Sequence, residues 1–281
     1  MRSLSDLHMH WKCTLLFLFS GLSSIGIYGQ SAIPVPGGSH TDSWYIYWGW
    51  NREVYTRSDI HFQGADYDFT LQDVRAIDRQ TKFSVNPYLN PVKMTIPQYN
   101  FRLGYYLNDH WNVSLGIDHM KYVMVQRQVV TMNGWIGGDH TYTGTYDERS
   151  QRLNKDFLVF EHTDGLNDLN LELRYSSVLG EWPQVTLRHT EGGGVGVLIP
   201  RTNTTLLGME RYDEFHLAGW ALQVMAGLQL TFFERFLIQS EVKTGLIDMP
   251  DIRTTSSVLD KASQHFLFLQ GNLVFGVAFG R

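Results

Sequence analysis

The most regular feature of the chain is an alternation of apolar and polar residues with a period of two. Between positions 99 and 107 every second residue is apolar, and Asn100, Arg102 and Gly104 take the other face. A period of two is typical of a β-strand with one apolar face, whereas the apolar stripe of an amphipathic helix is nowhere sustained. The chain is therefore predicted to be all-β.

Segments with this alternation recur along the whole chain and are separated by connections of two kinds. The eight segments lie near 43–54, 96–107, 110–126, 166–178, 183–198, 214–232, 235–248 and 264–280. The short connections are Asn108-Asp109, Leu179 to Trp182 and Phe233-Glu234, and the long ones are 55–95, 127–165, 199–213 and 249–263. Strict alternation of short and long connections is typical of an antiparallel up-and-down transmembrane β-barrel with about eight strands, periplasmic turns and long external loops.

The two longest connections are too long to lack secondary structure in a compact domain. In the first, two strand-like stretches flank Gly64-Ala65-Asp66, which suits a hairpin turn. In the second, two such stretches surround Gly134 and Gly137-Gly138. We expect both connections to form β-hairpin extensions of the barrel wall.

A soluble β-sandwich or a lipocalin-like barrel would show the same alternation, and two features favour the membrane alternative. The polar face carries Asn, Gln, Ser, Thr and Gly more than Lys and Glu, as in a packed polar interior. Aromatic residues, including Tyr45, Tyr47 and Tyr106, gather at strand ends and predict girdles at the membrane interfaces. The predicted interface aromatics are Trp44, Trp48, Trp50, Trp111, Phe232, Phe236, Phe275 and Phe279.

Composition narrows the class of protein further. The 281 residues are 43% hydrophobic and 18% charged, with a net charge of −5 and no block of Lys or Arg. These values argue against a disordered chain and against a nucleic-acid-binding protein. No apolar stretch is long enough for a helical membrane bundle.

The N-terminus has the features of a secretory signal peptide. Arg2 and Lys12 precede a short apolar run, which is followed by small residues up to Gly29. We therefore expect a signal peptide at 1–29, a short periplasmic N-terminal segment at 30–41 and the barrel at 42–281. The only cysteine, Cys13, would leave with the signal peptide, so no disulfide framework is expected.

Strand number, loop alternation and signal peptide together resemble the small eight-stranded outer-membrane barrels of the OmpA-, OmpX- and OmpW-like kind. The resemblance covers 42–281 and is architectural. Such barrels usually end in an aromatic residue, whereas here Gly280-Arg281 follows Phe279. The resemblance implies a porin-like protein of the Gram-negative outer membrane, in contact with outer-membrane lipids, lipopolysaccharide and the barrel-assembly machinery.

Charged residues on the polar face would point into a narrow lumen. They are Arg102, Asp118, Glu172, Arg174, Arg188, Glu241 and Lys243. Side chains just fill the interior of an eight-stranded barrel, and buried charges must be paired, so the charges are expected to form a closed plug. A gated polar pore or a proton-linked ligand path is the alternative.

Catalytic candidates are weak. Some barrels of this size modify lipid A with a Ser/His/acid set, and Ser263 with His265 and His189 with Glu191 share strand faces. The order His-x-Ser expected of such a deacylase is absent. The glycine run 192–196 lacks the Lys-Ser/Thr of a phosphate loop and is expected to let the wall bend or pack closely. Neither a cofactor nor a metal is expected.

We therefore expect a non-enzymatic barrel with a closed polar lumen and a structural or surface-interaction role, in which the external loops contact an envelope protein partner. One alternative is a carrier or narrow channel for small hydrophobic molecules. The other is a lipid A-modifying acyl hydrolase.

Overall fold

The computed structural model describes residues 41–280 apart from 89, 91, 94–95 and 140. The expected signal peptide (1–29) and nearly all of the expected periplasmic segment (30–41) lie outside the described residues and stay predictions.

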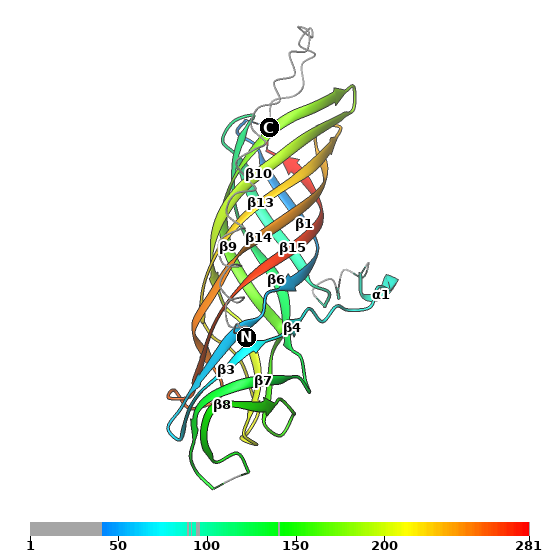
Figure 1. The fold of residues 1–281 in the computed structure, drawn as a ribbon. Helices are drawn as coiled ribbons and strands as arrows, with labels where there is room; N and C mark the ends of the chain where they lie inside the picture. Colours follow the sequence, from blue (N-terminus) through cyan, green and yellow to red (C-terminus); the bar gives the residue numbers. More distant parts are fainter. Residues whose placement is uncertain (1–40, 89, 91, 94–95, 140, 281) are drawn as a thin grey trace, which may run out of the picture. The chain divides into compact units, whose positions relative to one another are not determined.

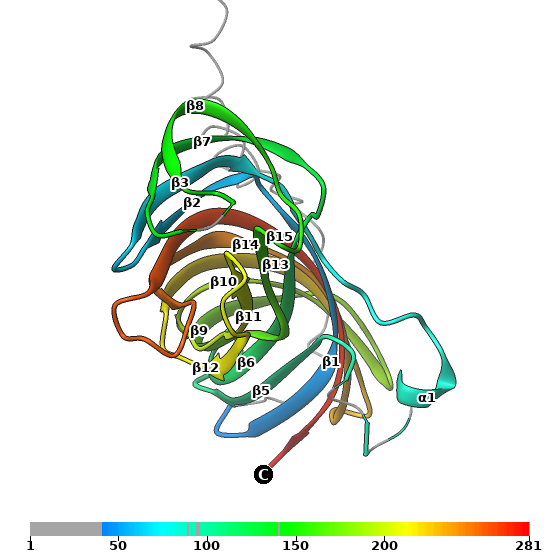
Figure 2. The same ribbon diagram turned by 90° about the horizontal axis from the view of Figure 1, so that it is seen from below.

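Eight antiparallel strands form a closed ring (Figures 1 and 2). In ring order they are β1 (Trp44–Tyr55), β5 (Tyr99–Tyr106), β6 (Trp111–Met124), β9 (Leu158–Trp182), β10 (Val185–Leu198), β13 (Gly219–Phe232), β14 (Phe236–Arg253) and β15 (Lys261–Phe279). The ring closes between β1 and β15, with Trp44 opposite Phe279 and Tyr55 opposite Phe268. Each strand overlaps one predicted segment, so the predicted up-and-down barrel is confirmed.

Several of the predicted connections have different bounds. The connection expected at 127–165 ends at residue 157, because β9 begins at Leu158, and the one expected at 199–213 extends to the start of β13 at Gly219. The stretch Leu179 to Trp182, expected to be a turn, is the end of β9, and the turn to β10 is Pro183-Gln184. Proline fits this turn because its fixed φ suits a turn position and it has no N–H to donate to a strand ladder. The last connection, expected at 249–263, shortens to 254–260 because β14 and β15 pair as far as Arg253 and Lys261.

The long connections build a second layer at the opposite end from the short turns. Strands β2 (Ser58–Gln63), β3 (Tyr67–Val74), β7 (Val129–Ile136) and β8 (Gly144–Arg152) continue the sheet from β15 in that order. Both predicted hairpins are therefore present as β2–β3 and β7–β8. The shorter elements are β4 (Ala76–Ile77), α1 (Val85–Tyr88), β11 (Arg201–Leu206) and β12 (Tyr212–Phe215).

The interior changes chemistry along the strands. On β9 the inward residues Phe160 and Leu166 belong to a large apolar core at the long-connection end, whereas Glu172, on the same face, is buried nearer the short turns. The outward face of β9 shows the opposite order. The polar Glu161 faces outward next to the buried Phe160, and the apolar Leu171, next to the buried Glu172, is 52% exposed. An outward apolar belt therefore surrounds the polar part of the lumen, and outward polar residues surround the apolar part. Among the described residues no helix is long and apolar enough to cross a membrane.

Candidate functional site

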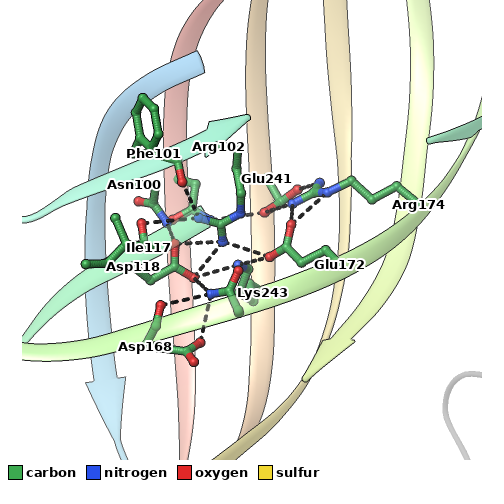
Figure 3. A network of polar contacts seen from close by, with 12 residues as sticks. Asn100, Phe101, Arg102, Ile117, Asp118, Asp168, Glu172, Arg174, Glu241 and Lys243 are labelled. Carbon is green, nitrogen blue, oxygen red and sulfur yellow. Dashed lines mark hydrogen bonds and ion pairs between the residues drawn. The ribbon is translucent and has the colours of Figure 1, made fainter. Parts of the chain in front are cut away.

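The structure brings six of the seven predicted lumen charges into one cluster, which we call the lumen network. Its members are Arg102 on β5, Asp118 on β6, Glu172 and Arg174 on β9, and Glu241 and Lys243 on β14. Their side chains are at most 3% exposed. Strand alternation places each of them on the inward face, as Figure 3 shows.

Glu172 is the centre of the lumen network. Its Oε1 accepts hydrogen bonds from Arg102 Nη2 at 2.7 Å and from Lys243 Nζ at 2.6 Å. Its Oε2 accepts two from Arg174, at 3.0 Å from Nε and 2.6 Å from Nη2. Each carboxylate oxygen thus has two charge-assisted bonds, which are roughly twice as strong as neutral ones.

Asp118 links opposite walls of the barrel. Lys243 Nζ on β14 donates to Asp118 Oδ2 on β6 at 2.7 Å, and β6 and β14 stand four places apart in the eight-membered ring. Arg102 Nη2 lies 2.8 Å from Asp118 Oδ1, and Asn100 and Asn170 also donate to this carboxylate. Side chains from opposite walls are therefore in direct contact across the lumen (Figure 3).

Glu241 completes the charge balance. It is paired with Arg174 and accepts hydrogen bonds from Gln239 Nε2 at 2.9 Å and from Asn272 Nδ2 at 3.1 Å. Within the six residues of the network, three carboxylates therefore face two guanidinium groups and one ammonium group. Burying an unpaired ion costs several kcal/mol, so this pairing is a condition for burying the network. The neighbouring carboxyl of Asp168 is also buried and accepts a hydrogen bond from Asn170 Nδ2 at 2.9 Å.

Glycines on β10 make room for the lumen network. Gly192, Gly194 and Gly196 lie on the inward face, where a Cβ on Gly194 would stand 2.8 Å from Glu172 Cγ and one on Gly196 would stand 1.8 Å from Asp168 Oδ1. A Cβ on the outward Gly193 would come no closer than 3.4 Å to a neighbouring atom. The inward glycines therefore leave space for the side chains of the lumen, and no loop that the structure describes packs against them.

A layer of tyrosines lies between the lumen network and the short turns. Tyr45, Tyr47 and Tyr106 are buried with Leu237, Val274 and Ala278. Tyr47 Oη accepts a hydrogen bond from Arg174 Nη2 at 3.3 Å, so this layer contacts the network. The sequence prediction that these three tyrosines belong to the interface girdle is wrong. Applying the alternation strictly would have found them. On β1, Tyr45 and Tyr47 occupy the odd positions and the tryptophans the even ones. On β5, Tyr106 shares the inward face of Arg102.

The eight predicted interface aromatics all lie on the outward face. Those next to the short turns are Trp44, Trp111, Phe232, Phe236 and Phe279. The other three, Trp48, Trp50 and Phe275, form a patch further along β1 and β15, with ring centroids 5.0 Å apart for Trp48–Trp50 and 5.9 Å apart for Trp50–Phe275.

Arg188 does not join the lumen network. It lies three residues from the start of β10, at the short-turn mouth, where its Nη1 is 3.4 Å from the carbonyl oxygen of Asp109. No ion pair recorded for the described residues includes it. The alternation gives the face of a strand residue but not its depth in the lumen, which depends on the stagger between strands.

The catalytic candidates are not brought together. Ser263 and His265 share the outward face of β15, and His189 and Glu191 share that of β10. β13 and β14 separate β10 from β15 in the ring, and no hydrogen bond recorded for the described residues joins the members of either pair. In the described part of the chain, no three His, Cys, Asp or Glu side chains are placed to hold a metal ion.

No family model and no curated protein matches the chain. Among solved structures it is similar to the outer membrane protein OprG from Pseudomonas aeruginosa, with 11% identity, a TM-score of 0.37 and coverage of 86% of this chain and 97% of OprG. It is also similar to Ail, the attachment invasion locus protein of Yersinia pestis, with 12% identity, a TM-score of 0.29 and coverage of 83% and 99%. A third is the N-terminal β-barrel domain of OprF from Pseudomonas aeruginosa, with 9% identity, a TM-score of 0.28 and coverage of 85% and 98%. The architecture rests on the pairing of the chain's own strands.

Proposed function

We propose that the protein is an outer-membrane β-barrel whose lumen is closed, and that it acts through its external layer as a structural or surface-interaction protein. The outward apolar belt supports the location. Leu171, Leu222 and Leu267 are each about half exposed, at 51–52%, on three different strands of the ring. Such a surface is suited to lipid, because a soluble protein rarely exposes a contiguous apolar surface this extensive.

The single observation that carries the closed lumen is the contact between Lys243 and Asp118 across the ring, at 2.7 Å. An ammonium and a carboxylate at this distance leave no space for water between them. The tyrosine layer on one side and the apolar core on the other add two further barriers. A polar pathway would have to cross all three layers.

The closed lumen is tested by solute flux into proteoliposomes. Vesicles carrying the purified full chain are diluted into isotonic solutions of small sugars, and swelling is followed by light scattering. We expect swelling no faster than in protein-free vesicles. Swelling comparable to that of vesicles with an open porin would overturn the proposal.

The external layer supports the interaction role because it is large and is packed onto the same apolar core as the adjoining end of the barrel. Phe62 and Phe69 stack there at 5.2 Å and are at most 1% exposed. Rigid surface structure of this kind is where binding sites usually lie. The role is tested by cross-linking on whole cells with the chain and with a variant lacking 129–152. A protein that is cross-linked to the complete chain and not to the variant supports the proposal. If both insert correctly into the membrane and give the same cross-linked proteins, the proposal is contradicted.

A further inference from the structure

The connection 78–98 lies between β4 and β5, and its described residues (78–88, 90, 92–93 and 96–98) run outside the ring beside β1 (Figures 1 and 2). We call these residues the side loop. Its aromatic contact with the wall is Tyr88, which is 4% exposed and whose ring lies 5.7 Å from that of Trp50. Trp50 belongs to the outward aromatic patch with Phe275. The side loop is therefore fixed to the surface that continues the apolar belt.

Hydrogen bonds hold this anchor in place. The hydroxyl of Tyr88 accepts from Arg52 Nη2 at 2.5 Å and donates to the carbonyl oxygen of Thr81 at 2.7 Å. The guanidinium of Arg52 also lies 5.9 Å from the Tyr88 ring centroid. Tyr88 thus connects the base of the side loop to β1 through its ring and its hydroxyl.

Three apolar side chains of the side loop are largely exposed. Phe83 is 78% exposed, Val85 71% and Val92 90%, although the ring of Phe83 lies 5.1 Å from that of Tyr88. Their exposure to water is costly, and none of the three belongs to either apolar core of the protein. A surface that accepts them must be apolar and must lie beside the barrel wall.

The charge of the side loop is unlike that of the rest of the chain. The connection 78–98 contains Arg79, Lys82 and Lys93 and one acid, Asp78, in a chain with a net charge of −5. Asp78 lies at the start of the connection, where it accepts hydrogen bonds from the backbone N–H of Glu53 and from Gln98 Nε2. Lys82 and Lys93 are exposed, and neither ammonium group has an ion-pair partner among the described residues. Exposed apolar residues interspersed with free lysines are typical of segments that lie in the interface of an anionic membrane.

We propose that the side loop is a membrane foot, which inserts Phe83, Val85 and Val92 into the outer leaflet and binds phosphorylated lipid headgroups through Lys82 and Lys93. This rests on the proposed outer-membrane location and adds the lipid surface that the protein binds beside its wall. Two observations favour lipid over a second copy of the chain. The foot continues the lipid-facing belt, and its positive charge matches lipid phosphate.

Depth-dependent quenching tests the insertion. In a Cys13→Ser background, single cysteines at Val92, at Leu171 in the belt and at Val129 in the external layer carry the same fluorophore. Val129 is the matched control, because it is a 63% exposed valine on β7. In vesicles containing brominated phospholipid and lipid A, labels at positions 92 and 171 should be quenched at least about twofold more than the label at 129. Quenching at 171 with none at 92 overturns the membrane foot alone, and no quenching at 171 overturns the outer-membrane location itself.

Lipid A titrated into the full chain in neutral detergent tests the charge recognition, with the label at position 92 as readout. The Lys82→Gln/Lys93→Gln variant should bind lipid A up to about 25-fold more weakly at low salt, because each lysine near an anionic surface contributes about fivefold. Lys155→Gln, which removes an exposed lysine elsewhere, should bind as the unmodified chain does. The proposal is contradicted if the double variant binds lipid A as tightly as the unmodified chain. It is also contradicted if the signal depends on protein concentration and not on lipid, as expected when a second copy of the chain binds.

Discussion

At the scale of single residues, the burial of six charges depends on Glu172. It is the only member of the lumen network that contacts all three cations, Arg102, Arg174 and Lys243. Removing its charge leaves three buried cations to share two carboxylates. Breaking a buried ion pair from one side is strongly destabilising, whereas an exposed pair contributes little.

Glu172→Gln should therefore lower the free energy of unfolding by about 3–5 kcal/mol. Arg188→Gln is the matched control, because Arg188 lies on a barrel strand but outside the network, and it should change stability by less than about 1 kcal/mol. Urea unfolding in detergent, followed by tryptophan fluorescence, measures both. Equal midpoints for the two variants would mean that the network does not hold the barrel together.

The sequence predicted which charged residues face the lumen, whereas it did not predict how deep in the lumen each one lies. The alternation identified Arg102, Asp118 and Glu172 as inward-facing, but it placed Arg188 beside them although that side chain lies at the mouth. The partners of each charge depend on how far neighbouring strands are shifted along one another. That shift is set by the closure of the ring and by the turns, and single-strand periodicity carries no information about it.

At the scale of elements, the residues of β10 fit the space needed by the lumen network better than they fit the usual preference for residues in strands. Glycine weakens a strand, and yet β10 carries Gly192, Gly193, Gly194 and Gly196. The inward glycines leave the volume that Glu172, Arg174 and Asp168 occupy. The sequence showed the glycine run, but only the structure shows which glycines face the charges.

Gly194→Ala should cost about 1–3 kcal/mol through overpacking, because its Cβ would press on Glu172 and on the carbonyl oxygen of Leu171. Gly193→Ala, one residue away on the outward face, should stay within about 0.5 kcal/mol of the unmodified chain. Samples of both variants are heated to increasing temperatures and run on gels without boiling. The temperature at which the compact, fast-migrating form disappears compares their stabilities. If Gly193→Ala proved the more harmful, the assignment of inward and outward faces on β10 would be wrong.

The external layer shares its apolar core with the adjoining end of the barrel. It should nevertheless unfold separately, because its sheet ends in the open edge of β8, whereas each strand of the ring is paired on both sides. Phe69→Ala, which empties a site beside Phe62, should cost about 3–5 kcal/mol within that layer. Hydrogen exchange should then speed up in β2, β3 and β7 and stay unchanged in β10 and β13. Faster exchange throughout the ring would show that the two layers unfold as one unit.

At the scale of the whole molecule, the longest strands have an outward face that is apolar in one part and polar in another. Where the outward face is apolar the interior is polar, and where the outward face is polar the interior is apolar. The alternation and the order of short and long connections together predicted the ring. The exchange of inside and outside was not predicted. In the sequence it is only a shift of the apolar residues from even to odd positions, as from Leu166 to Leu169 on β9, and the period does not say which face points inward.

The account centres on a lumen closed by direct contact between opposite walls, and single-channel recording in planar bilayers tests this claim most directly. The unmodified chain should give no steady conductance. The double variant Glu172→Ala/Lys243→Ala, which removes the centre of the network and its link to Asp118, should also give no steady conductance, because the tyrosine layer and the apolar core remain in place. Arg188→Ala should remain silent as well. Steady conductance of the unmodified chain at low voltage would contradict the closed lumen.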